Sequence, residues 1–190
     1  RKQEIGAENV YDYSLGNPNV PCPQVITDCM IRLLETEPPS ALHAYTASAG
    51  SLKTRTAVAD YIKRKYGLEA EAEDVYMTAG AAASLTITLR AVSTAAEEVI
   101  VFTPYFPEYK VFIENAGAVI REVPVRSDDF QIDFTALEAV FSERTAALIV
   151  NSPNNPTGAM FSAETLAALG DFLRQKESLY GKEIYLISDE

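Results

Sequence analysis

From residue 74 onwards, short and almost continuously apolar runs alternate with longer segments in which apolar residues recur every three or four positions. Runs of the first kind predict buried β-strands, and segments of the second kind predict helices that pack one face against a sheet. The strands are expected at residues 75–78, 98–102, 118–125, 146–150 and 184–188, and the helices at residues 80–93, 107–116, 134–141 and 163–179. Apolar strands separated by helices form a mainly parallel sheet that is covered on both faces. The predicted fold class is therefore α/β, a three-layer sandwich with a mainly parallel sheet.

The front part of the chain has a different pattern. Three prolines interrupt residues 15–23, which are expected to be irregular and extended. Apolar residues then recur at helical spacing from Val25 to Leu34, and the Pro38-Pro39 pair would end that helix. Residues 52–66 predict a second amphipathic helix, with Gly67 directly after its end.

The composition argues against several classes of function. The net charge is −11 at pH 7, whereas nucleic-acid binders and proteins of anionic membrane surfaces carry basic clusters. No apolar run approaches the roughly 18 residues that span a bilayer, and the first residues lack the apolar stretch of a signal peptide. Cys22, Cys29 and His43 show no metal-binding spacing. We therefore expect no nucleic acid, no membrane and no metal, and we interpret the cysteines as reduced thiols of a cytoplasmic protein.

In parallel sheets, ligands bind beyond the carboxyl ends of the strands, so chemistry is expected in the segments that follow the predicted strands. Small residues at 79–83 open a helix after the first strand. Bare N–H groups and the helix dipole suit a phosphate there, although such a turn can also serve packing alone. Tyr105 and Phe106 follow the second strand. Either ring could stack on a flat heteroaromatic ligand or simply fill the core.

The fourth and fifth predicted strands are followed by polar segments. Residues 151–158 contain two X-Pro bonds, which are candidates for cis peptides that aim a polar side chain. An ordinary surface turn is the alternative. Asp189 comes at the end of the fifth strand, where a buried carboxylate is costly unless it is paired. Its alternative role is to cap the next helix.

Taken together, these segments resemble those of the class I/II aminotransferases, the aspartate aminotransferase-like enzymes of the fold-type-I superfamily that depends on pyridoxal 5'-phosphate (PLP). The resemblance rests on the segments SLGNPNVPCP (14–23), HAYTASAG (43–50), AGAAASL (79–85), TPYFPEY (103–109), NSPNNPTG (151–158) and ISDE (187–190). It covers nearly the whole chain and implies the front half of such an enzyme. Residues 1–40 would belong to the small domain and to an arm that borders the substrate. Residues 41–190 would form part of the PLP-binding large domain, incomplete at its C-terminus.

The resemblance assigns cofactor-binding roles to individual residues. Gly80, Ala81 and Ala82 would present the helix N-terminus to the PLP phosphate. Phe106 would stack on the pyridine ring, and Asn155 would hydrogen-bond the phenolic oxygen of that ring. Asp189, the implied catalytic residue, would pair with the protonated ring nitrogen, because opposite charges stabilise each other's charged forms.

Two further roles concern the substrate and the partner subunit. The resemblance implies that Gly16 lines the pocket for the substrate carboxylate, together with Asn155. It also implies that Tyr45 reaches the cofactor phosphate of the neighbouring subunit, which predicts a homodimer. The expected substrates are an amino acid and a 2-oxo acid.

The chain also departs from the family pattern. Many relatives place Ser, Thr or Lys in the phosphate turn, where this chain has Gly80, Ala81 and Ala82. The Schiff-base lysine, a tyrosine and the carboxylate-binding arginine of the family are expected beyond Glu190. The lysines that are present are expected to be solvated surface residues: Lys2, Lys53, Lys63, Lys65, Lys110, Lys176 and Lys182.

Aminotransferase activity is the first interpretation of the resemblance. A carbon–sulfur lyase or an enzyme like aminocyclopropane-carboxylate synthase is an alternative on the same scaffold. A second alternative is the aminotransferase-like, ligand-sensing domain of a regulator. Such regulators usually carry a basic DNA-binding helix ahead of the domain, and residues 1–40 show none.

Overall fold

The computed structural model describes residues 2–11, 16 and 20–190. The chain divides into two compact units, Arg1–Ala47 and Ser48–Glu190. The predicted boundary after residue 40 concerns domain membership and stays a prediction. In the first unit the described elements are α1 (Lys2–Ile5), η1 (Ala7–Asn9), α2 (Gln24–Thr36) and α3 (Pro39–Leu42). Helix α2 confirms the first predicted helix and ends before Pro38, as proline chemistry requires. The predicted irregular segment 15–23 lies partly outside the described residues, at positions 15 and 17–19.

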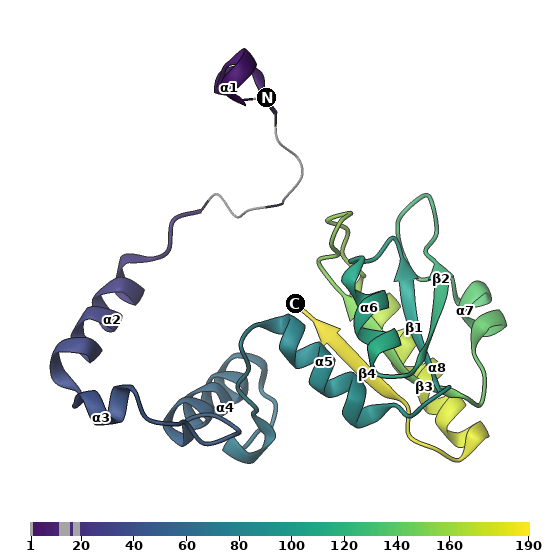
Figure 1. Ribbon diagram of the computed structural model, residues 1–190. Helices are drawn as coiled ribbons and strands as arrows, with labels where there is room; N and C mark the ends of the chain where they lie inside the picture. The colour runs from purple at the N-terminus through teal and green to yellow at the C-terminus, as the bar shows by residue number, and fades with distance from the viewer. Residues whose placement is uncertain (1, 12–15, 17–19) are drawn as a thin grey trace. The chain divides into compact units, whose positions relative to one another are not determined.

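The second unit contains the helices and strands that position the site (Figure 1). The helices are α4 (Leu52–Tyr66), η2 (Ala72–Asp74), α5 (Ala81–Val92), α6 (Glu108–Asn115), α7 (Phe134–Val140) and α8 (Ala163–Tyr180). The strands are β1 (Glu98–Thr103), β2 (Val119–Pro124), β3 (Thr145–Asn151) and β4 (Tyr185–Asp189). Helix α4 has the predicted bounds, and Gly67 ends it in the left-handed conformation, with φ +68°.

The four strands form one sheet in the order β2-β1-β3-β4, and every neighbouring pair is parallel. The register sets Thr103 opposite Pro124 and Asn151 opposite Asp189. The last residues of neighbouring strands are therefore side by side, and the carboxyl ends meet at one edge of the sheet.

Helices cover both faces of this sheet. Alternate residues of a strand point to opposite faces, and the residues on each face pack against a different pair of helices. On one side, Val99 and Val101 of β1 pack in a cluster with residues of α5 and α6. On the other side, Ile100 and Phe102 pack in a cluster with residues of α7 and α8. These strand residues are at most 4% exposed. The predicted three-layer α/β sandwich with a parallel sheet is thus confirmed.

The prediction of a strand at residues 75–78 is wrong. Val75–Thr78 is irregular, and a backbone hydrogen bond, from Met77 N to Ala49 O at 3.0 Å, joins it to the residues before α4. An apolar run becomes a strand only when a neighbouring strand supplies a ladder of hydrogen bonds. Within the described residues no strand pairs with this segment, and Tyr76 and Met77 remain exposed.

Within the described part of the chain, no helix is both long enough and apolar enough to cross a membrane.

Candidate functional site

The centre of the candidate site is Asp189, the last residue of β4. The side chain of Asn151, its neighbour across the sheet, donates a hydrogen bond from Nδ2 to Asp189 O at 2.7 Å. The hydroxyl of Tyr109, on α6, donates to Asp189 Oδ2. Tyr109 is only 1% exposed, so this bond joins a buried donor to a half-buried carboxylate. Asp189 is thereby held through both its backbone and its side chain. The carboxylate has the partner that a buried charge at a strand end requires, and this partner is Tyr109.

Tyr109 is a site residue that the sequence reasoning missed. Burial raises the pKa of its hydroxyl well above the ordinary value of 10.0, and the hydrogen bond to Asp189 raises it further. The hydroxyl therefore remains a proton donor across the neutral pH range. The available signal was a tyrosine within the segment 103–109, but aromatic residues in such a position are most often core residues.

The aromatic residues before α6 surround Tyr109. The Phe106 ring meets the Tyr109 ring edge-on, with centroids 5.7 Å apart. The Tyr105 ring lies nearly parallel to it, 6.3 Å away, and the Tyr105 hydroxyl donates to Glu122 Oε1 at 2.6 Å. Burial and this hydrogen bond raise the pKa of Tyr105 to about 12. Phe106 is half-buried and lies beside the tyrosine that holds Asp189, while its stacking on a cofactor ring stays a prediction.

Asn155 lies in the loop after β3 and is connected to Asp189 through Asn151. Asn155 N donates to Asn151 Oδ1 at 2.6 Å, and the amide group of the same Asn151 side chain contacts the backbone of Asp189. Asn155 is exposed. The Ser152–Pro153 and Asn155–Pro156 bonds are both cis, as the sequence suggested. The structure thus brings Asn155 and Asp189 to the same edge of the sheet.

The N-terminus of α5 lies at this edge too. Helix α5 ends at Val92, β1 begins at Glu98, and both pack in the same cluster, so the helix must run antiparallel to the strand. Gly80 precedes the helix with φ +89° and no side-chain capping bond. The N–H groups of the first turn, at Ala81 and Ala82, have no acceptor within the helix.

Space and hydroxyl groups are also available at this turn. A Cβ atom on Gly80 would meet nothing within 4 Å, and Ala81 and Ala82 are exposed. Thr78 Oγ1 and Ser84 Oγ, which the sequence reasoning did not single out, lie 2.6 Å apart beside Gly80. The turn offers backbone donors and the positive end of a helix dipole in open space, a combination that suits an anion.

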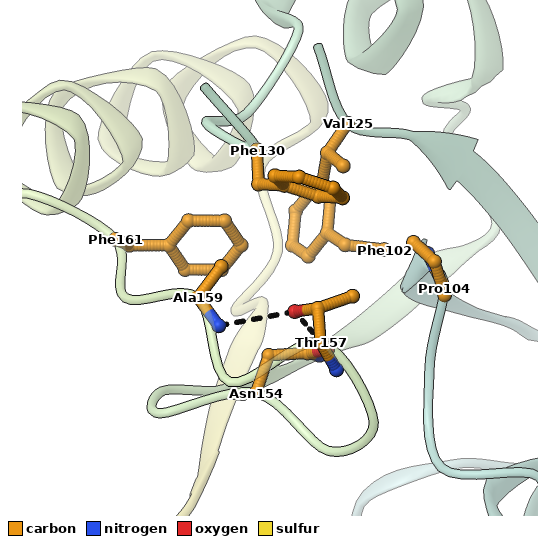
Figure 2. Close-up of a pocket in the computed structure, with 8 residues that line it drawn as sticks. All are labelled: Phe102, Pro104, Val125, Phe130, Asn154, Thr157, Ala159 and Phe161. Carbon is orange, nitrogen blue, oxygen red and sulfur yellow. Dashed lines mark hydrogen bonds between the residues drawn. The ribbon is translucent and has the colours of Figure 1, made fainter. Parts of the chain in front are cut away.

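The small cavity in Figure 2 lies behind the loop 151–158 and is not the cofactor site. Its lining includes Phe102, Phe130, Asn154 and Phe161. Its volume of about 10 Å³ leaves room for roughly one water molecule. The cavity is apolar packing space beneath the loop.

Two further predicted site residues lie outside the Ser48–Glu190 unit. Gly16 and Tyr45 belong to the Arg1–Ala47 unit, and both are exposed, so their roles stay predictions. The expectation that every lysine is solvated is wrong for Lys176, which is 7% exposed. Its ammonium group pairs with Glu138 and lies over the rings of Phe141 and Phe172, because burial of a charge requires such partners.

The described part of the chain gathers no group of three or more His, Cys, Asp or Glu side chains that could hold a metal ion. Cys22 and Cys29 are free thiols.

The fold and this edge define a class of protein: an α/β protein with a carboxylate, aromatic rings and a helix N-terminus collected at the carboxyl ends of parallel strands. Residues 7–190 match the family model "Aminotransferase class I and II", so this chain belongs to the class I and II aminotransferase family. The family uses PLP.

Individual relatives agree with this assignment. The chain is 37% identical to a probable aspartate/prephenate aminotransferase of Thermus aquaticus, over 77% of this chain and 37% of that protein. It is 32% identical to the aspartate/prephenate aminotransferase of Thermus thermophilus, over 92% of this chain and 43% of that protein. An aminotransferase structure from Eubacterium rectale superposes with a TM-score of 0.96 at 46% identity, over 100% of this chain and 48% of the other. The chain spans less than half the length of these relatives.

Proposed function

We propose that this chain is the front part of a PLP-dependent aminotransferase that moves an amino group between an amino acid and a 2-oxo acid. The observation that carries the proposal is the anchored carboxylate of Asp189. This carboxylate lies at the end of a parallel strand and accepts a hydrogen bond from the Tyr109 hydroxyl. Hydrogen bonds of the Asn151 side chain join the backbone of Asp189 to the backbone of Asn155. The cytoplasmic location stays a prediction that rests on the sequence.

The chemical character of the described residues supports a PLP site. The open, uncapped turn at Gly80, Ala81 and Ala82 suits a phosphate. Asp189 suits a protonated ring nitrogen, since a carboxylate favours the charged form of a neighbouring base. Phe106 and Asn155 would contact the ring face and the phenolic oxygen of the same molecule.

When bound, PLP supplies an electron sink for the negative charge that develops at the substrate α carbon. Asp189 would hold a proton on the ring nitrogen and so keep that sink strong. The Tyr109 hydroxyl fixes the orientation of the Asp189 carboxylate, and Asn151 fixes its backbone. The backbone N–H groups of α5 would neutralise the phosphate and hold its position.

The remaining parts of the proposal concern residues beyond this edge. The lysine that bonds the cofactor would lie outside the 190 residues, in a part that corresponds to the uncovered part of the longer relatives. Gly16 would border the substrate carboxylate, and Tyr45 would act in the partner subunit of a homodimer.

An experiment on the full-length protein tests this function. The protein is incubated with PLP, and the stoichiometry of bound cofactor is measured after dialysis. It is then supplied with a panel of amino acids and 2-oxo acids, and the new amino acids are identified by mass spectrometry. We expect one bound cofactor per chain and formation of a new amino acid. Release of ammonia with a 2-oxo acid would instead support the lyase alternative, and absence of cofactor binding would refute the proposal.

A further inference from the structure

A glutamine outside the site, Gln131, connects three segments of the second unit. Its Nε2 donates to Met160 O at 3.0 Å and to Asp129 O at 3.2 Å. Its Oε1 accepts from Ser162 N and from Thr165 Oγ1, both at 2.9 Å. Gln131 therefore ties the turn before α7 to the end of the loop after β3 and to the first turn of α8.

The chemistry of the amide makes this connection specific. A glutamine side chain offers two N–H donors and two acceptor lone pairs, and all four are used. The orientation of the amide is also settled, because Ser162 N–H can only donate and the Met160 carbonyl can only accept. A half-buried side chain with this many contacts holds its partners in one arrangement.

The segment that Gln131 holds closes the loop that carries Asn155. Phe161 lies between the two anchored residues, and its N–H donates to Ser152 Oγ at 3.0 Å. One step further into the loop, Asn154 N donates to Ala159 O at 2.8 Å. The stem of the loop is thus fixed from Gln131 inwards, and Asn155 follows directly after the closed stem.

The same turn, residues 126–131, also lines the cavity beneath the loop through the side chain of Phe130. Phe130 has φ +57°, which is a costly conformation for a bulky residue and persists only where the surroundings impose it. Figure 2 shows its ring lining the cavity next to Phe102, on the side away from Asn154 and Thr157 of the loop. The turn is held by hydrogen bonds from Phe130 N to Arg126 O and from Arg126 N to Gln131 O. The turn 126–131 therefore supports the loop with both a ring and an amide.

We propose that Gln131 is a positioning residue for the cofactor loop: it holds residues 159–162 so that Asn155 stays where it can contact the cofactor ring. This inference rests on the proposed function for the identity of the ligand. The restraint on the loop itself is a property of the chain without cofactor, and it can be measured separately.

The test compares Gln131→Glu with Gln175→Glu in the full-length protein. Gln131→Glu keeps the acceptor Oε1 but replaces the NH2 group, with both of its donors, by a negatively charged oxygen that faces two carbonyl groups. Gln175 is an exposed residue of α8, so its variant makes the same charge change without these contacts. Hydrogen exchange of the cofactor-free proteins is followed in peptides from 151–162 and from β1 and β3. The PLP dissociation constant and the pH titration of the bound cofactor's absorbance are measured in parallel.

We expect exchange in 151–162 to become roughly tenfold faster in Gln131→Glu, as loss of about two hydrogen bonds implies. The dissociation constant of PLP should rise by a similar factor, and the absorbance titration should shift. Peptides from β1 and β3, and all peptides of the Gln175→Glu control, should exchange as in the wild type. If Gln131→Glu does not fold, Gln131→Met removes the same donors without adding charge and is read in the same way.

Unchanged exchange in 151–162 would overturn the inference. Equally accelerated exchange in β1 and β3 would also overturn it, because Gln131 would then only stabilise the fold. A wild-type protein that fails to bind PLP would instead refute the proposed function, while its loop exchange would still report on the restraint.

Discussion

Removing one hydroxyl group, in Tyr109→Phe, tests how Asp189 is held. The ring and its contacts with Tyr105 and Phe106 remain, so the change creates almost no cavity. What is lost is the hydrogen bond from a buried hydroxyl to a half-buried carboxylate. Hydrogen bonds to charged groups contribute about 1.5–3 kcal/mol to stability, and every 1.4 kcal/mol is a factor of about ten in an equilibrium constant.

We therefore expect Tyr109→Phe to lower the free energy of unfolding of the cofactor-free, full-length protein by about 1.5–3 kcal/mol. The PLP dissociation constant should rise by at most roughly 100-fold, if the whole of this energy is needed to orient Asp189. Urea denaturation measures the first quantity, and fluorescence titration with PLP measures the second.

The pH dependence has a definite sign. The pKa of Tyr109 is raised in the folded state, so its stabilisation is fully present below its ordinary value of 10.0 and is lost as pH rises beyond it. The difference between wild type and Tyr109→Phe should be constant from neutral pH to about pH 9 and should shrink above pH 10.

Tyr105→Phe is the matched control, because it removes the same atom from the neighbouring ring. The Tyr105 hydroxyl donates to the carboxylate of Glu122, which is exposed, and such exposed charged contacts contribute about 0–1 kcal/mol. If Tyr109→Phe matched this control in stability and in PLP affinity, the hydroxyl would not anchor Asp189.

Three further predictions concern the full-length protein. Asp189→Ala should keep the fold but slow removal of the substrate α proton by roughly 100-fold or more; near-normal rates in stopped-flow half-reactions would contradict the assignment. In hybrid dimers of one Tyr45→Phe and one Asp189→Ala protomer, the site with intact Asp189 should bind PLP as in the wild type, because the partner supplies Tyr45; weakened binding there would refute action in trans. Glu98→Gln should lower the free energy of unfolding by about 3 kcal/mol, since the 1%-exposed carboxylate of Glu98 bonds Arg121, Arg144 and Ser142. Burial alone would raise the Glu98 pKa, but these bonds lower it below 4.5, so the effect in thermal denaturation should be full above pH 5 and should shrink as pH falls below about 4.

The periodicity of the sequence was enough to predict helices α2, α4, α5, α6, α7 and α8 and four of the five expected strands, but not the four-residue helices α1 and α3. Runs such as residues 98–102 and 146–150 are apolar on both faces, and only a covered parallel sheet buries both. The same argument failed at Val75–Thr78, where the apolar pattern is present but no described strand pairs with it. The pattern of apolar residues shows which side chains a segment can bury. Whether the segment forms a strand depends on a second segment that supplies its backbone hydrogen bonds.

The positions of Asn155 and Asp189 could also be predicted, because they follow strands whose carboxyl ends must share one edge. The same argument does not hold for Gly80, because Val75–Thr78 before it is not a strand. Asn155, Asp189 and the α5 turn at Gly80 come from three separate segments and lie at that edge in the structure. The resemblance to a family supplied their roles, since spacing alone does not distinguish a phosphate turn from a packing turn.

What only the tertiary structure decided are the partners of these residues. The donor to Asp189 is Tyr109, 80 positions earlier in the chain, and the residue that braces the Asn155 loop is Gln131, which reaches Met160, 29 positions later. Lys176, which the sequence predicts to be solvated, is buried, with its ammonium group over the rings of Phe141 and Phe172. A hydrogen bond or an ion pair requires two groups to meet within about 3 Å in the right orientation. That condition depends on how the elements pack, whereas burial periodicity and turn chemistry depend on neighbouring residues and can be read from the sequence alone.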